Sequence, residues 1–317
     1  MAFFKQYTDI IGNTPMIRFC RGFGENAKVF GKIEAANPSA SVKVRGAAAM
    51  ILDAEEKGLL KPGMRIIEPT SGNMGLALAA VAAAKGYELT LIMPENANID
   101  RRRLLISLGV KLVLTSDTTG MIGALRKVNE IASSKPGVYF RPRQFSNPIH
   151  VRVHEETTGP EIWNETNGEI DVLVAGVGTG STLTGVARYI KKTKGKNITV
   201  VAVEPKRSPV ITQHLAGDPL APGPHKLQGL GPGFIPENLD LSLVDRVEMT
   251  GNMESMSFTR HIAEKEGIML GISSGAAGLV ASRLAALPEF VGKTIVVVLP
   301  DGAERYMQTQ LFEGLEN

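Results

Sequence analysis

The sequence predicts an α/β protein built from two doubly wound lobes, each with a mainly parallel sheet between layers of helices. Apolar runs of strand length alternate with helical segments almost throughout the chain, which is typical of parallel sheets with helices on both faces. The alternation restarts at Asp171 after an irregular stretch around 142–148. This restart indicates a smaller lobe of residues 38–147 and a larger lobe of residues 148–317. Residues 1–37 could join either lobe, and we assign them to the larger one.

The expected strands of the smaller lobe are 65–68, 89–93 and 111–114, and those of the larger lobe are 171–175, 198–203 and 294–299. One expected helix begins at Val42. The other expected helices cover 74–85, 100–108, 121–134, 182–192, 253–266 and 274–287. Ligands of such sheets bind at the carboxyl ends of the strands. Each motif described below stands at a strand end or a helix start.

Composition excludes several function classes. The 35 basic and 32 acidic residues leave a net charge of +3, and the basic stretches 101–103 and 191–196 contain no interleaved aromatic residues, so we interpret them as solvated surface and expect no nucleic-acid partner. The longest apolar run, 74–84, is too short to span a membrane, and no signal peptide is recognisable. A single cysteine, Cys20, favours a reducing compartment. We expect a cytoplasmic protein that does not bind membranes.

The segment from Glu34 to Lys43 favours a reactive lysine. The Asn37-Pro38 pair ends the preceding structure, Ser39 and Ser41 are candidate helix caps, and the helical pattern begins at Val42. Lys43 therefore falls in a first helical turn, where the helix dipole and Arg45 both disfavour its charged form. A neutral amine is what a Schiff-base lysine requires. Taken alone, Lys43 would more simply be a solvated lysine at a helix start.

The stretch Thr70-Ser71-Gly72-Asn73-Met74-Gly75 follows a strand and opens a helix. Backbone N–H groups at a helix start, two hydroxyls and an amide form a cradle suited to a carboxylate or a phosphate. The simpler alternative is an ordinary capping turn, because Thr, Ser and Asn are common caps.

A second cradle is the glycine-rich loop Gly176 to Thr182, again between a strand and a helix. The glycines at 176 and 178 half match a dinucleotide fingerprint, and Glu204 ends the next strand where a ribose-binding acid would lie. The third glycine is missing, however, and three hydroxyl residues, Thr179, Ser181 and Thr182, crowd the loop. They favour a terminal phosphate monoester.

A third turn, Gly271-Ile272-Ser273-Ser274, also enters a helix. A hydroxyl at this position either binds a ring nitrogen or caps its own helix. The five histidines have no metal-ligand spacing, so no metal is expected, and no Ser/His/Asp order stands out. A reactive lysine, a phosphate-monoester cradle and a carboxylate cradle together suggest pyridoxal 5'-phosphate acting on an amino acid.

The chain resembles the cysteine synthase (O-acetylserine sulfhydrylase) family, of the tryptophan-synthase-like fold type II of pyridoxal-phosphate enzymes. The resemblance runs from Ile10-Ile11-Gly12-Asn13-Thr14-Pro15 through 157–163 to Gly302-Ala303-Glu304-Arg305-Tyr306. It implies that the cofactor lies between the lobes, that the smaller lobe is mobile and binds substrate, and that the larger lobe binds the cofactor phosphate.

The resemblance also implies the roles of individual residues. Lys43 would carry the cofactor and remove the Cα proton, Asn73 would bind the ring hydroxyl oxygen, and Ser273 would face the ring nitrogen. The phosphate would be held by Gly178, Thr179, Gly180, Ser181 and Thr182. The substrate carboxylate would be bound by Thr70, Ser71 and Gln144, with Met74 beside them.

The chain departs from the family at Met74, where a threonine is usual, and nearby at Ala40, Arg141, Arg143 and Ser181. Because the threonine hydroxyl is lost, the sequence does not determine which nucleophile is the second substrate. The reaction expected first is O-acetyl-L-serine plus sulfide to L-cysteine and acetate. The alternatives are a synthase using hydroxyurea, cyanide, a thiol or an amine as nucleophile, a simple elimination, and a non-catalytic partner-binding homologue. The family implies a homodimer and a possible partner, the C-terminal tail of serine acetyltransferase.

Overall fold

The computed structural model describes residues 4–24 and 26–315, which divide into two compact units. The smaller unit combines 37–150 with the described residues up to Ile11, and the larger combines 12–36 with the described residues from Val151 onward. The sequence placed the whole segment 1–37 in the larger lobe, and this differs from the structure. Tyr7 and Ile11 pack against the core of the smaller unit, which accounts for the difference.

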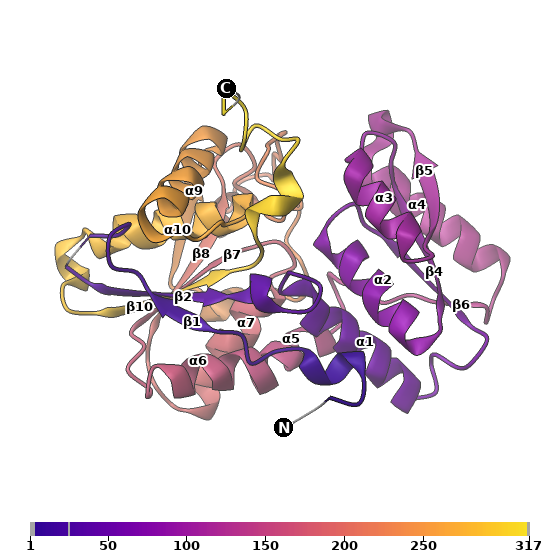
Figure 1. The fold of residues 1–317 in the computed structure, drawn as a ribbon, viewed down its shortest axis with the longest axis horizontal. Coiled ribbons are helices and arrows are strands. Elements are labelled where there is room, and N and C mark those ends of the chain that lie inside the picture. Colours follow the sequence, from indigo (N-terminus) through magenta and orange to yellow (C-terminus); the bar gives the residue numbers. More distant parts are fainter. Residues whose placement is uncertain (1–3, 25, 316–317) are drawn as a thin grey trace. The chain divides into compact units, whose positions relative to one another are not determined.

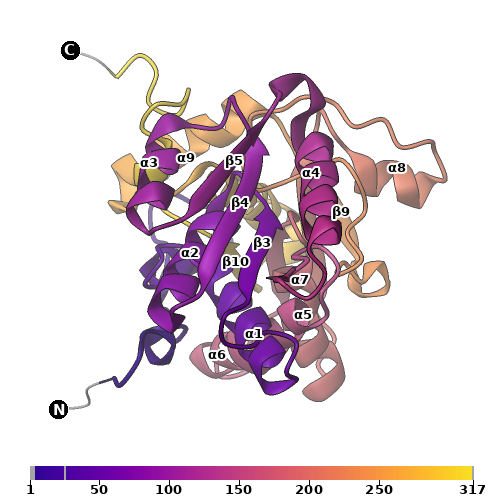
Figure 2. The same cartoon turned by 90° about the vertical axis from the view of Figure 1, so that its right-hand side faces the viewer.

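The smaller unit is a four-stranded parallel sheet in the order β5-β4-β3-β6. Its strands are β3 (Arg65–Pro69), β4 (Glu88–Pro94), β5 (Lys111–Thr115) and β6 (Tyr139–Phe140). Its helices are α1 (Lys43–Glu56), α2 (Asn73–Lys85), α3 (Ile99–Ser107) and α4 (Gly120–Ser134). Helices α2 and α4 lie on opposite sides of strands β3 and β4 (Figure 2). Successive residues of β3 point to opposite faces of the sheet: Ile66 packs with α1 and α2, and Ile67 packs with α4.

The larger unit is a six-stranded sheet in the order β1-β2-β10-β7-β8-β9, parallel except for the β1–β2 pair. Its strands are β1 (Met16–Arg18), β2 (Lys28–Ile33), β7 (Val172–Gly176), β8 (Thr199–Pro205), β9 (Arg246–Thr250) and β10 (Thr294–Leu299). Helices α9 (Asn252–Glu266) and α10 (Ile272–Ala285) cover one face, and α6 (Gly159–Glu165) and α7 (Ser181–Arg188) cover the other (Figure 1). Helices α5 (Ile149–Val153) and α8 (Val210–Ala216) are short, and π-helical turns at His154–Thr158 and Tyr189–Thr193 follow α5 and α7.

Every strand and helix expected from the sequence is present, with ends that differ by a few residues. The strands β1, β2, β6 and β9 and the helices α5, α6 and α8 were not expected. Strand β2 contains Lys28, Gly31 and Lys32, and β9 is an edge strand with alternating charges, so neither reads as an apolar run. In the described part of the chain, no helix has the length and apolar character that crossing a membrane requires.

Candidate active site

Lys43 is the first residue of α1, as the sequence predicted, and its side chain is partly buried. The helix follows Val42 directly and has no side-chain cap, so the expected capping by Ser39 or Ser41 does not occur. The main-chain N–H of Val44 donates to the carbonyl oxygen of Ser41 at 3.4 Å instead. The first turn of α1 therefore leaves Lys43 where backbone N–H groups concentrate positive potential.

The loop Thr70–Gly72 connects β3 to α2 in the same unit. Thr70 is buried, and its hydroxyl oxygen accepts a hydrogen bond from the N–H of Gly72 at 3.2 Å. Helix α2 starts at Asn73, and its N-cap residue, Gly72, has no side chain that could cap it. The hydroxyl of Thr70 therefore orders the turn before the helix through its hydrogen bond with Gly72.

Arg101 of α3 supports this loop, which the sequence did not predict. Its guanidinium donates to the carbonyl oxygen of Ser71 at 2.5 Å. The run Arg101–Arg103 was interpreted as solvated surface, and for Arg101 that interpretation is wrong, because its hydrogen bond to Ser71 fixes the loop that begins α2.

Met74 is 2% exposed and belongs to the core cluster of the smaller unit, with Leu78, Leu91 and other apolar side chains. Its thioether therefore fills core volume. A side chain in this position contributes packing, not a hydrogen-bonding group.

Gln144 lies in the turn after β6 and is held on both sides. The Glu68 carboxylate accepts the N–H groups of Arg143 at 3.1 Å and Gln144 at 3.0 Å. The carbonyl oxygen of Gln144 lies 3.0 Å from Nδ1 of His150. Because a carbonyl oxygen can only accept, Nδ1 of His150 carries the proton. The side-chain amide of Gln144 reaches back to the carbonyl oxygen of Pro69 at 3.5 Å, so it lies beside the Thr70–Asn73 loop.

Burial shifts both titratable groups of this turn. Burial raises the pKa of Glu68 to about 7, although its two hydrogen bonds and the charges of Arg141 and Arg143 oppose the shift. Burial and the nearby charge of Lys43 lower the pKa of His150 to about 3. The His150 ring lies directly on α1, because a Cβ atom on Gly46 would fall 2.2 Å from its Cδ2. His150 is therefore a neutral imidazole packed one turn from Lys43.

In the larger unit, the loop from Gly178 to Thr182 joins β7 to α7 and is tightly enclosed. A Cβ atom on Gly178 would lie 2.3 Å from the carbonyl oxygen of Gly229, so only glycine fits there. Gly180, the residue before α7, has a φ of 78°, which also favours glycine. This loop brings the backbone N–H groups of a helix start next to the hydroxyls of Thr179 and Thr182, an arrangement that suits a phosphate.

The hydroxyl of Ser181 faces a different partner. It accepts a hydrogen bond from the side-chain amide of Asn238 at 3.1 Å, and both residues are buried. The backbone N–H of Ser181 donates to the Thr179 hydroxyl at 3.4 Å, and its side chain ties the loop to the segment that contains Asn238.

Ser273 lies in the first turn of α10 and is 3% exposed. The helix follows Gly271 without a side-chain cap, and the neighbouring Ser274 donates to the carbonyl oxygen of Asp301 at 2.9 Å. Ser273 therefore does not cap its helix. A Cβ atom on Gly229 would lie 3.3 Å from the Ser273 hydroxyl oxygen, so Gly229 separates Ser273 from the Gly178 loop.

Glu204 is not placed as the ribose-binding acid of a dinucleotide site. Its carboxylate accepts the N–H groups of Ile211 at 2.8 Å and Thr212 at 2.9 Å, and the Thr212 hydroxyl at 2.6 Å. It is buried and fixes the start of α8, which removes the acid that a dinucleotide site would need.

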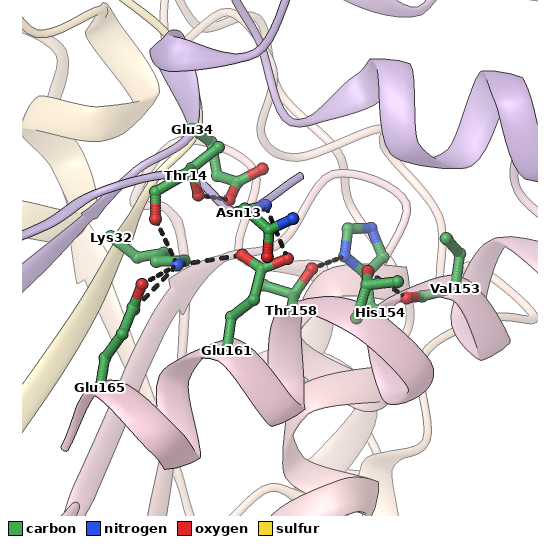
Figure 3. A network of polar contacts seen from close by, with 10 residues as sticks. Asn13, Thr14, Lys32, Glu34, Val153, His154, Thr158, Glu161 and Glu165 are labelled. Atoms are coloured by element: carbon green, nitrogen blue, oxygen red, sulfur yellow. Dashed lines mark hydrogen bonds and ion pairs between the residues drawn. The ribbon is translucent and has the colours of Figure 1, made fainter. Parts of the chain in front are cut away.

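His154 lies near a buried polar network around Lys32 (Figure 3). It also contacts the loop of Gly178–Thr182. Its Nε2 lies 3.2 Å from the hydroxyl oxygen of Thr182, and its Nδ1 lies 2.9 Å from that of Thr158. One helical turn away, the buried ammonium of Lys32 contacts Glu161 at 3.0 Å and Glu165 at 2.8 Å. These contacts fix α6 and the π-helical turn from which His154 reaches Thr182. The sequence did not predict this role, since only the buried position of His154 reveals it.

Among residues 4–24 and 26–315, no three histidine, cysteine or acidic side chains are arranged to hold a metal ion.

Comparison with known proteins defines the class of this fold. Residues 7–301 match the family of pyridoxal-phosphate dependent enzymes. A cysteine synthase from Haemophilus influenzae is 54% identical over 316 residues, 100% of either chain. Two solved structures align with TM-scores of 0.93: a cysteine synthase from Entamoeba histolytica, at 37% identity with 100% of this chain and 93% of that chain covered, and an O-ureido-L-serine synthase, at 39% identity with 100% and 97% covered.

The fold is thus that of a fold type II enzyme with pyridoxal phosphate as cofactor. More particularly, the chain belongs to the cysteine synthase family.

Residues of both units fit this cofactor. The Gly178–Thr182 loop offers N–H and hydroxyl donors without room for a Cβ atom at Gly178, as close approach of a phosphate requires. Lys43 offers an amine in the first turn of α1, and Asn73 and Ser273 stand in the first turns of α2 and α10.

Proposed function

We propose that this enzyme replaces the acetate group of O-acetyl-L-serine by sulfide, giving L-cysteine and acetate. In this β-replacement the Cβ–O bond breaks, a Cβ–S bond forms, and acetate leaves. The observation that carries the proposal is the 54% identity to a cysteine synthase over the full length of both chains. It is supported by the presence in this chain of each residue that the chemistry needs.

Lys43 is proposed to bind the cofactor through Nζ and to hold the proton removed from Cα of the substrate. Gly178, Thr179, Gly180, Ser181 and Thr182 are proposed to hold the phosphate, Ser181 by its backbone. Bound pyridoxal phosphate supplies the electron sink that stabilises the negative charge left at Cα.

Asn73 is proposed to donate to the ring hydroxyl oxygen, and Ser273 to face the ring nitrogen. A neutral hydroxyl at the nitrogen leaves the ring uncharged, which suits prompt loss of the β substituent. Thr70, Ser71 and Gln144 are proposed to bind the substrate carboxylate through hydroxyl and amide donors, strengthened by the N–H groups at the start of α2.

Met74 is proposed to act by packing. Because the Met74 side chain is only 2% exposed, it does not form a surface against which an unusual nucleophile could bind. This favours sulfide over the alternatives of hydroxyurea, cyanide, a thiol or an amine. The presence of Lys43, the phosphate loop and Ser273 together favours an active enzyme over a non-catalytic homologue.

We further infer a cytoplasmic homodimer, as the family resemblance implies. The single cysteine, Cys20, is exposed and unpaired, which suits a reducing compartment. A serine acetyltransferase tail is a candidate partner because its terminal carboxylate would compete for the donors of the Thr70–Asn73 loop.

The test is to supply O-acetyl-L-serine with sulfide, hydroxyurea, cyanide, a small thiol or an amine and to identify products by mass spectrometry. We expect L-cysteine as the dominant product in the parent and in Met74→Thr. We also expect the Met74→Thr protein to be less stable, by about 1–3 kcal/mol, because a smaller side chain leaves a core cavity.

Faster turnover with another nucleophile than with sulfide, abolished in Met74→Thr, would contradict the proposal and make Met74 a specificity residue. The absence of any replacement product in the parent would contradict the enzyme assignment itself.

A further inference from the structure

The main chain around Gln144 is held by the carboxylate of Glu68, just beyond the point where the pairing of β3 and β6 ends. Strand β6 pairs with β3 only at Arg65–Tyr139 and Ile66–Phe140. Beyond that point the side chain of Glu68 in β3 takes the place of the main-chain hydrogen bonds between the two strands. Its two carboxylate oxygens accept the successive N–H groups of Arg143 and Gln144.

This turn needs such an anchor. Arg143 has a φ of 55°, a left-handed conformation that a side chain disfavours, and its side chain is exposed. Glu68 is 2% exposed, so its carboxylate has no bulk water to compensate for a lost hydrogen bond. His150 holds the carbonyl oxygen of Gln144 from the other side. The peptide units on either side of the Gln144 Cα atom are therefore both fixed.

We propose that Glu68 is a positioning residue: its ionised carboxylate fixes the Gln144 main chain so that the Gln144 side chain meets the carboxylate of the amino-acid substrate. The proposal rests on the proposed function, in which Gln144 binds that carboxylate. It assigns to a buried residue outside the ligand-binding loop a share of the affinity for the first substrate.

The protonation state of Glu68 then controls this affinity. Only the ionised form accepts both N–H groups, because a protonated carboxyl oxygen carries a hydrogen that faces a donor. The charged groups that act on Glu68 are Arg141 and Arg143, which stabilise its ionised form, and burial opposes them. Because the pKa of Glu68 is about 7, its carboxylate becomes protonated as the pH falls through 7, and it then accepts only one of the two N–H groups.

The experiment compares the holoenzyme with Glu68→Gln between pH 5.5 and 8. In the parent, we expect KM for O-acetyl-L-serine to rise about tenfold as the pH falls through 7, with a much smaller change in kcat. In the Glu68→Gln protein the side chain keeps its size and shape, but its single carbonyl oxygen accepts only one of the two N–H groups. We expect its KM to be high throughout and to lack this dependence on pH.

Glu204→Gln is the matched control. Glu204 is also a buried glutamate at a strand end, and it also accepts two successive main-chain N–H groups, but those belong to α8. We expect this variant to keep the KM of the parent and its pH dependence. Glu68→Asp, which retains a carboxylate, serves as a second variant if Glu68→Gln does not fold.

A readout independent of turnover is the amide NMR signals of Arg143 and Gln144 in the holoenzyme. In the parent they should shift with a midpoint near pH 7, and in Glu68→Gln they should not. Amide titration without any turnover would count against the proposed function alone. Turnover with a KM that is unchanged in Glu68→Gln, or with the same pH dependence in both proteins, would overturn the positioning role of Glu68.

Discussion

At the scale of single residues, the site is built from polar groups whose partners lie far away in the sequence. Glu68 and Gln144 are 76 residues apart, and no local pattern links them. The sequence proposes Lys43, Asn73 and Ser273 as site residues because each stands at a helix start, and the structure places each of them in a first helical turn. It could not predict Glu68, Arg101, His150 or His154, since their roles arise from tertiary contacts and burial.

His150 leads to a prediction about stability. Its pKa is about 3 in the folded protein and about 6.5 when unfolded, so the unfolded chain binds more protons between these values. Its contribution to stability is complete above pH 6.5 and is lost as the pH falls toward 3. Between pH 7 and pH 5, we expect it to lower the free energy of unfolding by about 2 kcal/mol.

His150→Asn is the matching variant, because asparagine can donate to the Gln144 carbonyl but does not titrate. Urea unfolding at both pH values measures the difference between the two proteins, and this subtraction removes the contribution of Glu68, which has the opposite sign in this range. If parent and variant lost the same stability at pH 5, His150 would not be buried in its neutral form.

At the scale of elements, the sequence predicted the long apolar strands and the helices that cover them, because their periodicity is strong. It missed β2 because Lys32 is buried within this strand. The ammonium of Lys32 forms ion pairs with Glu161 and Glu165 of α6, which no strand pattern reveals. The two-residue β6 is too short to give a pattern. Short elements and buried ion pairs thus account for most of the differences.

The β7–α7 loop provides a prediction at this scale. In Gly178→Ala the added Cβ atom meets a backbone carbonyl oxygen at 2.3 Å, so the loop must move. We expect pyridoxal phosphate to bind at least tenfold more weakly, because the loop is a proposed phosphate site. Titration of the apoenzyme with the cofactor, followed by absorbance, measures this loss.

Gly24→Ala is the control, since a Cβ atom on Gly24 meets nothing within 4 Å and its φ is ordinary. It should bind the cofactor like the parent. Equal affinity in Gly178→Ala and Gly24→Ala would mean that the β7–α7 loop does not hold the phosphate.

At the scale of the whole molecule, the proposed cofactor ligands are divided between the two units. Lys43 and Asn73 belong to the smaller unit, and the Gly178–Thr182 loop and Ser273 belong to the larger. The sequence predicted two lobes from the restart of the strand–helix pattern, but not that residues up to Ile11 join the smaller one. That assignment depends on the packing of Tyr7 and Ile11 on a core that is formed later in the chain.

The most direct test of the account is to identify the lysine that carries the cofactor. The purified holoenzyme is reduced with borohydride, digested, and mapped by mass spectrometry, with Lys43→Ala treated in parallel. We expect a pyridoxyl group on Lys43 in the parent and no covalent adduct in the variant, which should still bind the cofactor weakly through the Gly178–Thr182 loop. A pyridoxyl group on any other lysine of the parent, or a parent protein that takes up no cofactor, would contradict the account.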